Sequence, residues 1–271
     1  MMKSDIDPVL TQTFFLSAGE VNAEGEMALT LLTAKLIDIA TAHANALGVG
    51  NPVMADIGCG WVLSRLTVEL DETPRVNCTY AVSTWVESWN RHYSERSFKI
   101  YDPETGHVYG YVRSIWLVLN MTTRDNAGLS HLQLPENAVD GTPAPIERQA
   151  KHAVIVAPGE PAGPRMQVAT APPLNYSFKY CDVDYYRHVN TVRYIALLLN
   201  QYSLPYHDSH RVSRMELSFL HEALAGEKIE LLRYDQAGGN GDTSAFYLRK
   251  SGDHTPILYA RITFQPRTNK K

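Results

Sequence analysis

Cysteine is scarce in this sequence of 271 residues, which contains only Cys59, Cys78 and Cys181. An odd number of cysteines at wide spacings, with no C-x-x-C pair, fits neither a disulfide scaffold nor a zinc knuckle. We therefore interpret the three residues as free, buried thiols of a protein that stays in a reducing compartment.

Long apolar runs and an excess of basic side chains are also missing. No apolar run approaches the roughly 18 residues of a membrane-spanning helix, so no membrane span is predicted. The 25 basic and 29 acidic side chains give a net charge of −4, which argues against a nucleic-acid-binding protein. Because Met1–Val9 has no apolar core of a secretory signal, we expect a cytoplasmic protein.

Several catalytic signatures are absent as well. The sequence contains no G-x-S-x-G, H-E-x-x-H or G-x-x-x-x-G-K motif. One cluster of possible metal ligands has the spacing D-x-D-x-x-x-H, which matches no compact ligand set. We predict neither a metal nor a cofactor.

Proline is concentrated in the middle of the chain. Eight of the 15 prolines fall between Pro135 and Pro173, in a stretch with little periodicity. This composition is typical of a long connection, which we place over 131–173. We therefore predict an N-terminal domain over 1–130 and a C-terminal domain over 174–271.

Each half repeats one order of elements: a short strand, a helix and about four strands. Apolar residues at spacings of three and four predict the two helices, which we place over Leu32–Leu47 and Val192–Tyr202. A short sequence echo between positions 64–66 and 213–215 agrees with a duplication. The order predicts an α+β fold in which two antiparallel sheets each wrap around a long central helix.

The most reactive side chains gather between Asp182 and Asn190, where a strand is predicted to give way to a helix. The unpaired backbone N–H groups of a helix start favour negative charge, including the oxyanion that develops on an attacked carbonyl. In a second interpretation the aspartates cap the helix and His188 is a solvated side chain. The residues by themselves leave both interpretations open.

The chain resembles the acyl-acyl-carrier-protein (acyl-ACP) thioesterases, a family built from two hot-dog domains. The resemblance extends from about Phe14 to Phe264, and the end of it is similar to the family's active-site motif, D-x-D-x-N-x-H-V-N-N. The stretches that carry it are Trp61–Leu66, Glu69–Pro74, Ser83–Glu87, Ser114–Asn120, Asp182–Asn190 and Val192–Ile195.

The resemblance implies a tandem, or double, hot-dog fold and a catalytic set of Asp184, His188 and Glu222. In the family a glutamate on a later strand activates water, and Glu222 occupies that place. Tyr186 stands where the motif has an asparagine. A phenol can polarise the thioester carbonyl, or it can fill the pocket and block it.

The resemblance also implies where the substrate binds. The family places the acyl chain in the first domain, against its helix and sheet. Substrate-binding candidates are Tyr186 and Asn190 beside the catalytic set and, in the first half, Trp61, Trp116, Trp85, Leu32 and Leu36.

The implied reaction is hydrolysis of a fatty acyl-ACP thioester to a free fatty acid and the carrier thiol, in fatty acid biosynthesis. The implied partner is an acidic acyl carrier protein, which a net acidic chain can bind only locally, at Arg187, Arg193, Arg211 and Arg214. The alternatives are an acyl-CoA thioesterase and, because Tyr186 replaces the asparagine, a catalytically weak acyl-binding protein. A monomer and a homodimer are both compatible with the sequence.

Overall fold

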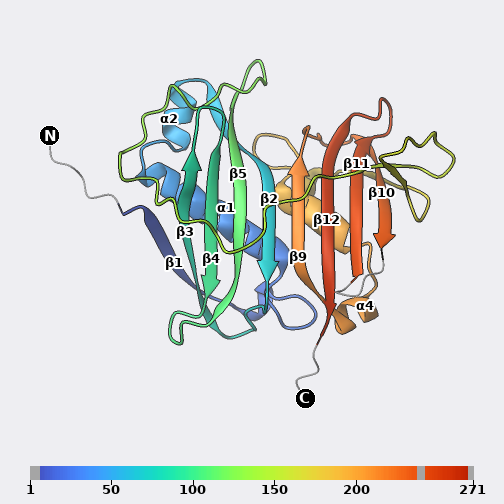
Figure 1. Ribbon diagram of the computed structural model, residues 1–271, viewed down its shortest axis with the longest axis horizontal. Helices are drawn as coiled ribbons and strands as arrows, with labels where there is room; N and C mark the ends of the chain where they lie inside the picture. The colour runs from blue at the N-terminus through green and yellow to red at the C-terminus, as the bar shows by residue number, and fades with distance from the viewer. Residues whose placement is uncertain (1–6, 237–241, 268–271) are drawn as a thin grey trace. The chain divides into compact units, whose positions relative to one another are not determined.

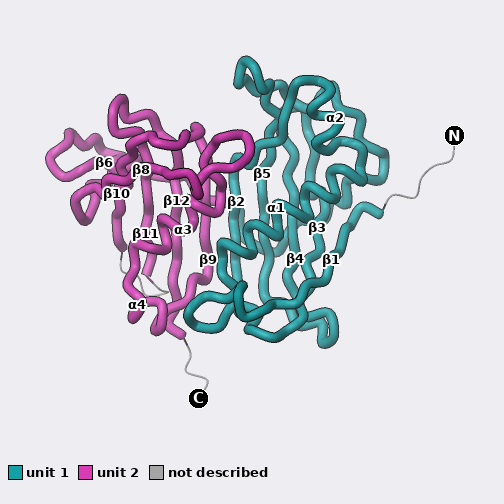
Figure 2. Tube along the Cα trace, turned by 180° about the vertical axis from the view of Figure 1, so that it is seen from behind, with its two compact units in different colours: residues 1–148 teal, residues 149–271 magenta. Residues whose placement is uncertain are grey.

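The computed structural model describes residues 7–236 and 242–267. The chain falls into two compact units, unit 1 over Met1–Arg148 and unit 2 over Gln149–Lys271. Figure 1 shows the elements and Figure 2 colours the two units. No helix of the described residues is long and apolar enough to cross a membrane.

Unit 1 contains a helix of 18 residues and five strands that pair antiparallel. These strands are hydrogen-bonded in the order β1-β3-β4-β5-β2. The elements of unit 1 in chain order are β1 (Val9–Phe15), η1 (Ala18–Glu20), α1 (Leu29–Ala46), α2 (Asn51–Asp56), β2 (Cys59–Leu70), β3 (Thr79–Trp89), β4 (Ser94–Tyr101) and β5 (Val108–Asn120).

Helix α1 lies against one face of the strands of unit 1 (Figures 1 and 2). Leu32, Leu36 and Ile39 recur at spacings of three and four, which puts them on one face of the helix. All three are buried, as are Val82 and Ile100 of the strands. The predicted helix and its core-facing side are confirmed.

Unit 2 also has five antiparallel strands, hydrogen-bonded in the order β9-β12-β11-β10-β8, and a separate parallel pair, β6 with β7. Its elements are β6 (Val154–Val156), β7 (Met166–Val168), β8 (Leu174–Ser177), η2 (Tyr180–Asp182), α3 (Thr191–Leu199), α4 (Leu204–Ser209), β9 (His210–Phe219), β10 (Lys228–Gln236), β11 (Asp242–Lys250) and β12 (Pro256–Pro266).

Helix α3 is shorter than predicted. It ends at Leu199, whereas the apolar spacing predicted a helix through Tyr202. The ring of Tyr202 instead lies 4.5 Å from the ring of Phe264, and the guanidinium of Arg233 lies 4.1 Å over it. Pro205, at the start of α4, also disfavours continuation of the helix. Tertiary contacts and a proline outweigh the helical spacing here.

The segment predicted as the connection, 131–173, packs against the strands of both units. In unit 1, the indole N–H of Trp85 donates to the carbonyl of Thr142 at 2.6 Å. In unit 2, the segment contains β6 and β7, and Ile155 of β6 is fully buried in a cluster with Leu232. Proline and glycine predicted the irregular path but not the packing.

The three cysteines are free, as predicted. They are not buried, because Cys181 is exposed and both Cys59 and Cys78 are half-buried. Cys181 lies in η2, a turn with no buried residue. Cysteine count and spacing predicted the absence of disulfides, but depth depends on the element that carries each thiol.

Candidate active site

The loop before α3, residues 179–190, is closed by its own hydrogen bonds. The Oδ1 atom of Asp184 accepts from the backbone N–H of Tyr186 at 2.9 Å and of His188 at 3.2 Å. The N–H of Asp184 donates to the carbonyl of His188 at 2.8 Å. Arg187 completes the turn with a φ of 67°, a value that residues other than glycine rarely adopt. Asp184 thereby fixes the backbone that carries the imidazole.

Asp182 and Asn190 stabilise the backbone at the two ends of this loop. The Oδ2 atom of Asp182 accepts from the N–H of Lys179 at 2.8 Å and from the hydroxyl of Tyr176 at 3.2 Å. Asn190 is the N-cap of α3, because its Oδ1 accepts from the N–H of Val192 at 3.1 Å. The cap of α3 is therefore Asn190 and not one of the aspartates, which the capping interpretation had named, and Asp182 bonds to the start of η2 instead. A substrate contact of Asn190 stays a prediction.

His188 and Glu222 are brought together from two distant segments. Nδ1 of His188 lies 3.4 Å from Oε1 of Glu222, and the two side chains are 25% and 39% exposed. Backbone pairing holds the segments, since the N–H of Val189 donates to the carbonyl of Ala223 at 2.9 Å and His188 forms an isolated bridge with Leu224. The spacing of this imidazole–carboxylate pair is thus set by the backbone.

The resemblance implied that Glu222 lies on a strand. In the structure it lies instead in the connection after β9. Strand β9 ends at Phe219. The N–H groups of Leu220 and His221 both donate to the carbonyl of Ile257, at 2.9 and 3.4 Å, which ends the regular ladder. A connection is more accessible than a strand interior, so the Glu222 carboxylate remains open to solvent.

The Tyr186 ring is at the surface of the loop. It is 47% exposed and contacts the ring of Tyr185, with the ring centroids 3.9 Å apart and the ring planes tilted by 37°. Burial and then the neighbouring Tyr186 raise the pKa of Tyr185 to about 12, so this phenol keeps its proton near neutral pH. Whether Tyr186 polarises a thioester carbonyl or blocks it stays a prediction.

Tyr194 is a residue of this region that sequence reasoning missed. It comes from the first turns of α3 and is buried, with its ring centroid 5.3 Å from that of Phe178 and 5.9 Å from that of Phe219. Burial, and more weakly the nearby carboxylates of Glu227 and then Glu222, raises the pKa of Tyr194. The sequence shows only an aromatic residue in a helix, which is usually ordinary core.

The possible metal ligands of the sequence do not gather into a metal site. Within residues 7–236 and 242–267, no three or more His, Cys, Asp and Glu side chains are grouped as a metal ion requires. The carboxylates of Asp182 and Asp184 accept from backbone N–H groups, and the imidazole of His188 faces Glu222.

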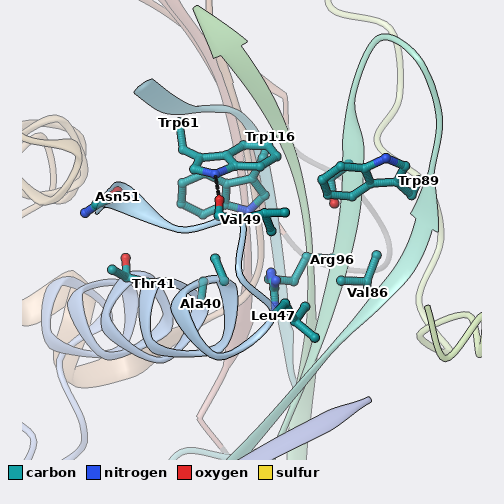
Figure 3. Close-up of a pocket in the computed structure, with 12 residues that line it drawn as sticks. Ala40, Thr41, Leu47, Val49, Asn51, Trp61, Val86, Trp89, Arg96 and Trp116 are labelled. Atoms are coloured by element: carbon teal, nitrogen blue, oxygen red, sulfur yellow. Dashed lines mark hydrogen bonds between the residues drawn. The ribbon is translucent and has the colours of Figure 1, made fainter. Parts of the chain in front are cut away.

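Unit 1 contains a pocket lined by α1 and by tryptophans of its strands (Figure 3). Trp61 and Trp116 line it together with Trp89, whose ring meets that of Trp61 edge-on at 5.8 Å. The indole N–H of Trp61 donates to the carbonyl of Val49 at 2.7 Å, which fixes the ring. Small residues of α1, such as Ala40, leave the space open. Acyl binding by these tryptophans stays a prediction.

Other residues proposed for this pocket lie elsewhere. Trp85 is bonded to the connection, and Leu32 and Leu36 belong to the core between α1 and the strands. Of the twelve lining residues only Trp61 and Trp116 were predicted, and Trp89 and Arg96 are among those that were missed. No local sequence signal distinguishes them, because consecutive residues of β3 and β4 are buried on both faces of these strands.

Two family models match the chain. The model described as acyl-ACP thioesterase N-terminal domain matches residues 7–130, and the model described as acyl-ACP thioesterase C-terminal domain matches residues 167–266. Together they cover well over half of the sequence.

Plant proteins are among the relatives. The chain is 24% identical over 276 residues to the chloroplastic palmitoyl-acyl carrier protein thioesterase of Gossypium hirsutum, a match that covers 97% of this chain and 65% of that protein. The protein of the same description from Cuphea hookeriana is 22% identical, over 96% of this chain and 63% of that protein. The chain therefore spans just under two thirds of the length of these curated relatives.

Solved structures show the same fold. An acyl-ACP thioesterase from Bacteroides thetaiotaomicron superposes with a TM-score of 0.81 at 26% identity, covering 95% of this chain and 98% of that chain. The 12:0-ACP thioesterase from Umbellularia californica superposes with a TM-score of 0.79 at 19% identity, covering 96% and 94%. The fold is the hot-dog fold.

Proposed function

Because this chain belongs to the acyl-ACP thioesterase family, we propose that it hydrolyses fatty acyl-ACP thioesters to a free fatty acid and the carrier thiol, in fatty acid biosynthesis. The observation that carries the proposal is the 3.4 Å approach of the His188 imidazole to the Glu222 carboxylate on an exposed loop. An imidazole and a carboxylate so placed can take a proton from water.

We assign acyl-chain binding and catalysis to different domains of a tandem hot-dog fold, in which two antiparallel sheets each wrap around their own helix. The N-terminal domain, 1–130, holds the acyl chain in the pocket lined by Trp61 and Trp116. The C-terminal domain, 174–271, carries the catalytic residues, and 131–173 connects the domains. Support comes from the pocket in unit 1 and the His–Glu pair in unit 2.

In the proposed reaction a water molecule attacks the carbonyl carbon of the thioester, and the carbon–sulfur bond then breaks. Glu222, together with His188, takes a proton from the water and returns it to the departing thiolate. The products are therefore a carboxylic acid and a thiol. General-base help of this kind contributes about 10²–10⁴-fold in rate. A thiolate leaves readily, so no strong general acid is required.

The oxyanion needs hydrogen-bond donors near the pair. The N–H groups of Val192 and Arg193 are already used by the side chain and the carbonyl of Asn190, at 3.1 and 2.9 Å. Thr191 is the first residue of α3, and the N–H of a first residue has no partner within its own helix. We assign this N–H and the Tyr186 phenol to the oxyanion, where loss of one donor costs on the order of 10²–10³ in rate.

The decisive experiment is an assay of the purified protein against acyl-ACPs of several chain lengths. We expect turnover in the native protein and a loss of roughly 10²–10⁴-fold in Glu222→Gln. His221→Gln is the matched control, because His221 is an exposed neighbour whose Nδ1 bonds the carbonyl of Pro256 at 2.7 Å. Native turnover in a folded Glu222→Gln variant would contradict the mechanism.

The two alternatives have their own outcomes in this assay. Faster turnover of acyl-CoA than of matched acyl-ACP identifies an acyl-CoA thioesterase. The presence of Tyr186 favours a catalytically weak acyl-binding protein, which is identified by no native turnover and a gain of turnover in Tyr186→Asn.

We propose that the carrier protein meets the exposed arginines of the loop region, Arg187 and Arg193. Arg214, which was also predicted for this role, is ion-paired with Glu216 at 2.8 Å and has its charge compensated. A cytoplasmic location stays a prediction, and a monomer and a homodimer both stay open.

A further inference from the structure

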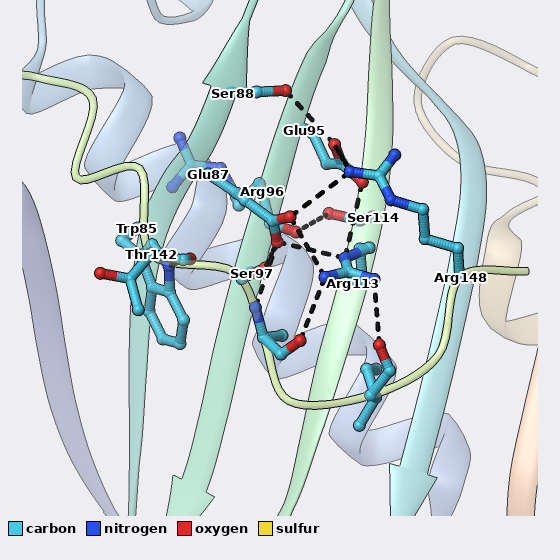
Figure 4. A network of polar contacts seen from close by, with 12 residues as sticks. Trp85, Glu87, Ser88, Glu95, Arg96, Ser97, Arg113, Ser114, Thr142 and Arg148 are labelled. Atoms are coloured by element: carbon cyan, nitrogen blue, oxygen red, sulfur yellow. Dashed lines mark hydrogen bonds and ion pairs between the residues drawn. The ribbon is translucent and has the colours of Figure 1, made fainter.

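Three arginines are buried among the described residues, and two of them are compensated by carboxylates. Arg113 lies 3.1 Å from Glu87 in the polar network of Figure 4, and Arg249 lies 2.6 Å from Glu160. Arg96 is as deeply buried, with 6% exposure against 8% for Arg113 and 5% for Arg249. Yet no carboxylate of the described chain lies within ion-pair distance of Arg96. A buried charge without a counter-charge is costly, so its position requires an explanation.

The hydrogen-bond partners of Arg96 are neutral. Its Nη1 donates to Nδ1 of His43 at 2.8 Å and to the hydroxyl of Thr84 at 3.2 Å. Burial, and then the charge of Arg96, lowers the pKa of His43 to about 4, so the imidazole is uncharged near neutral pH. Burial lowers the pKa of Arg96 to about 10, which still leaves the guanidinium charged. A positive charge without an ion-paired carboxylate therefore lies inside unit 1; the carboxylate of Asp7 acts more weakly on His43 and forms no ion pair with Arg96.

This charge lines the tryptophan-rich pocket of unit 1. Figure 3 shows the side chain of Arg96 next to Ala40 and Leu47, below the indoles of Trp61 and Trp116. A guanidinium has five N–H donors, and the two bonds to His43 and Thr84 both involve Nη1. Nε and Nη2 remain for a ligand. A pocket that receives only hydrocarbon gains nothing from such donors.

We propose that this pocket receives an acyl chain that carries a hydrogen-bond-accepting oxygen, and that Arg96 binds this oxygen. The inference rests on the proposed function, because it takes an acyl group as the ligand. The oxygen belongs to a hydroxyl, an oxo group or a carboxylate on the chain. All three accept from a guanidinium, and the carboxylate also supplies the missing counter-charge.

Ligand entry can be measured without turnover. Three of the four tryptophans of the sequence line the pocket, so intrinsic fluorescence reports on its occupancy. The probes are N-methyl amides of one chain length, either saturated or bearing a β-hydroxy, β-oxo, ω-hydroxy or ω-carboxy group, which contain no thioester. We expect at least one oxygen-bearing amide to bind roughly 10- to 100-fold more tightly than the saturated amide, as for a hydrogen bond to a charged group.

Variants then assign the preference to Arg96. Arg96→Met should abolish it without weakening binding of the saturated amide, and Arg96→Lys should keep part of it, because lysine retains the charge but not the planar fork. Thr41→Val is the matched control, since Thr41 is a polar lining residue from α1. If thermal unfolding shows that Arg96→Met does not fold, Arg96→Lys decides.

Equal affinity for all amides, or a preference that survives in Arg96→Met, overturns the inference. Turnover separates this failure from failure of the proposed function. A protein that hydrolyses saturated acyl-ACP but shows no oxygen preference refutes the role of Arg96 alone. A protein that prefers oxygen-bearing amides but hydrolyses no thioester refutes the hydrolase proposal alone.

Discussion

Two loops, one in each unit, share a backbone frame. In the first loop, residues 17–28, Oδ1 of Asn22 accepts from the N–H of the residue four positions later at 2.9 Å. In the second loop, residues 179–190, Oδ1 of Asp184 does the same at 3.2 Å. Each loop starts with a 3-10 turn and leads into the helix of its unit. The frame therefore repeats although the sequences differ.

The side chains on this frame differ in kind. In the first loop Glu26 forms an ion pair with Arg75 at 3.2 Å, and in the second loop His188 faces Glu222 at 3.4 Å. The Glu26 side chain is 7% exposed, against 25% for His188. The Glu26 carboxylate is buried in an ion pair with Arg75, whereas the second loop presents an imidazole and a carboxylate that solvent can reach. The same backbone arrangement can therefore hold a buried ion pair, which stabilises the fold, or an accessible imidazole–carboxylate pair, which can take part in a reaction.

The partner segments correspond too. The N–H of Met27 donates to the carbonyl of Pro74, and the N–H of Val189 donates to the carbonyl of Ala223, both at 2.9 Å. The next residue of each partner segment forms an isolated bridge: Arg75 with Glu26 in unit 1, and Leu224 with His188 in unit 2. This alignment shows which substitutions convert the second loop into the first.

The largest effect is expected when the second loop receives the ion pair of the first. His188→Glu combined with Leu224→Arg places a glutamate and an arginine on bridged positions, as Glu26 and Arg75 are. We expect the unfolding temperature to be retained and turnover of acyl-ACP to fall about 10²–10⁴-fold, because the imidazole is lost. Leu224→Arg alone is the control and should keep turnover. Full activity in the double variant would show that His188 is dispensable.

A smaller effect is expected when Asp184 becomes the asparagine of the first loop. An amide oxygen can accept the same backbone N–H bonds, so Asp184→Asn should lose no more than about tenfold in kcat, while Asp184→Ala should lose on the order of 100-fold through misplacement of His188. Steady-state kinetics of both variants distinguish the roles. Equal losses would mean that the charge of Asp184, and not its bonds to the backbone, is needed.

The turn residue gives a test of stability. Arg187 has a φ of 67°, and the corresponding turn of the first loop has Gly25 with a φ of 70°. Because glycine adopts this conformation without strain, Arg187→Gly should raise the free energy of unfolding by about 1 kcal/mol in a urea titration. Unchanged or lower stability would show that contacts of the Arg187 side chain outweigh the strain.

The reverse substitution should have an effect of similar or smaller size. A Cβ at Gly25 would meet no atom within 4 Å, so only the positive φ opposes it. We expect Gly25→Ala to lower the free energy of unfolding by about 0.5–1 kcal/mol. A loss of several kcal/mol in the same urea titration would mean that the first loop supports more of unit 1 than its contacts indicate.

Much of the architecture could be predicted from local sequence. The spacing of Leu32, Leu36 and Ile39 predicted both the existence of α1 and its buried face. The concentration of reactive side chains after Asp182 predicted where the candidate site lies. Turns and helix caps are formed by residues that are neighbours in the sequence, so local sequence is enough to predict them. The end of α3 could not be predicted, since it depends on a contact between Tyr202 and a distant strand.

The side-chain alternation of a regular strand was insufficient to predict which tryptophans line the pocket. Trp85 and Trp89 are four positions apart in β3 and on a regular strand would face the same side. A register shift between Val86 and Ser88 adds one residue to β3 opposite β4. As a result Trp85 bonds to the carbonyl of Thr142, while Trp89 lines the pocket. A one-residue bulge reverses the face, and no sequence pattern marks it here.

Arg96 was missed for a related reason. Glu95, Arg96 and Ser97 are all buried, because β4 is covered on both faces. Alternation between polar and apolar residues then disappears, and a buried cation looks like an ordinary surface charge in the sequence. Only the positions of the surrounding side chains show that this arginine has no carboxylate within ion-pair distance.

The amino-acid sequence alone predicted the repeated order of a short strand, a helix and about four strands, and the loop that carries the reactive side chains, since each depends on residues close together in the chain. The resemblance to the family rests on short stretches spread from about Phe14 to Phe264. The tertiary structure decided which groups meet: the imidazole of His188 with the carboxylate of Glu222, and the guanidinium of Arg96 with a pocket of tryptophans. Such encounters depend on register, bulges and pairing between distant segments, which local spacing does not specify.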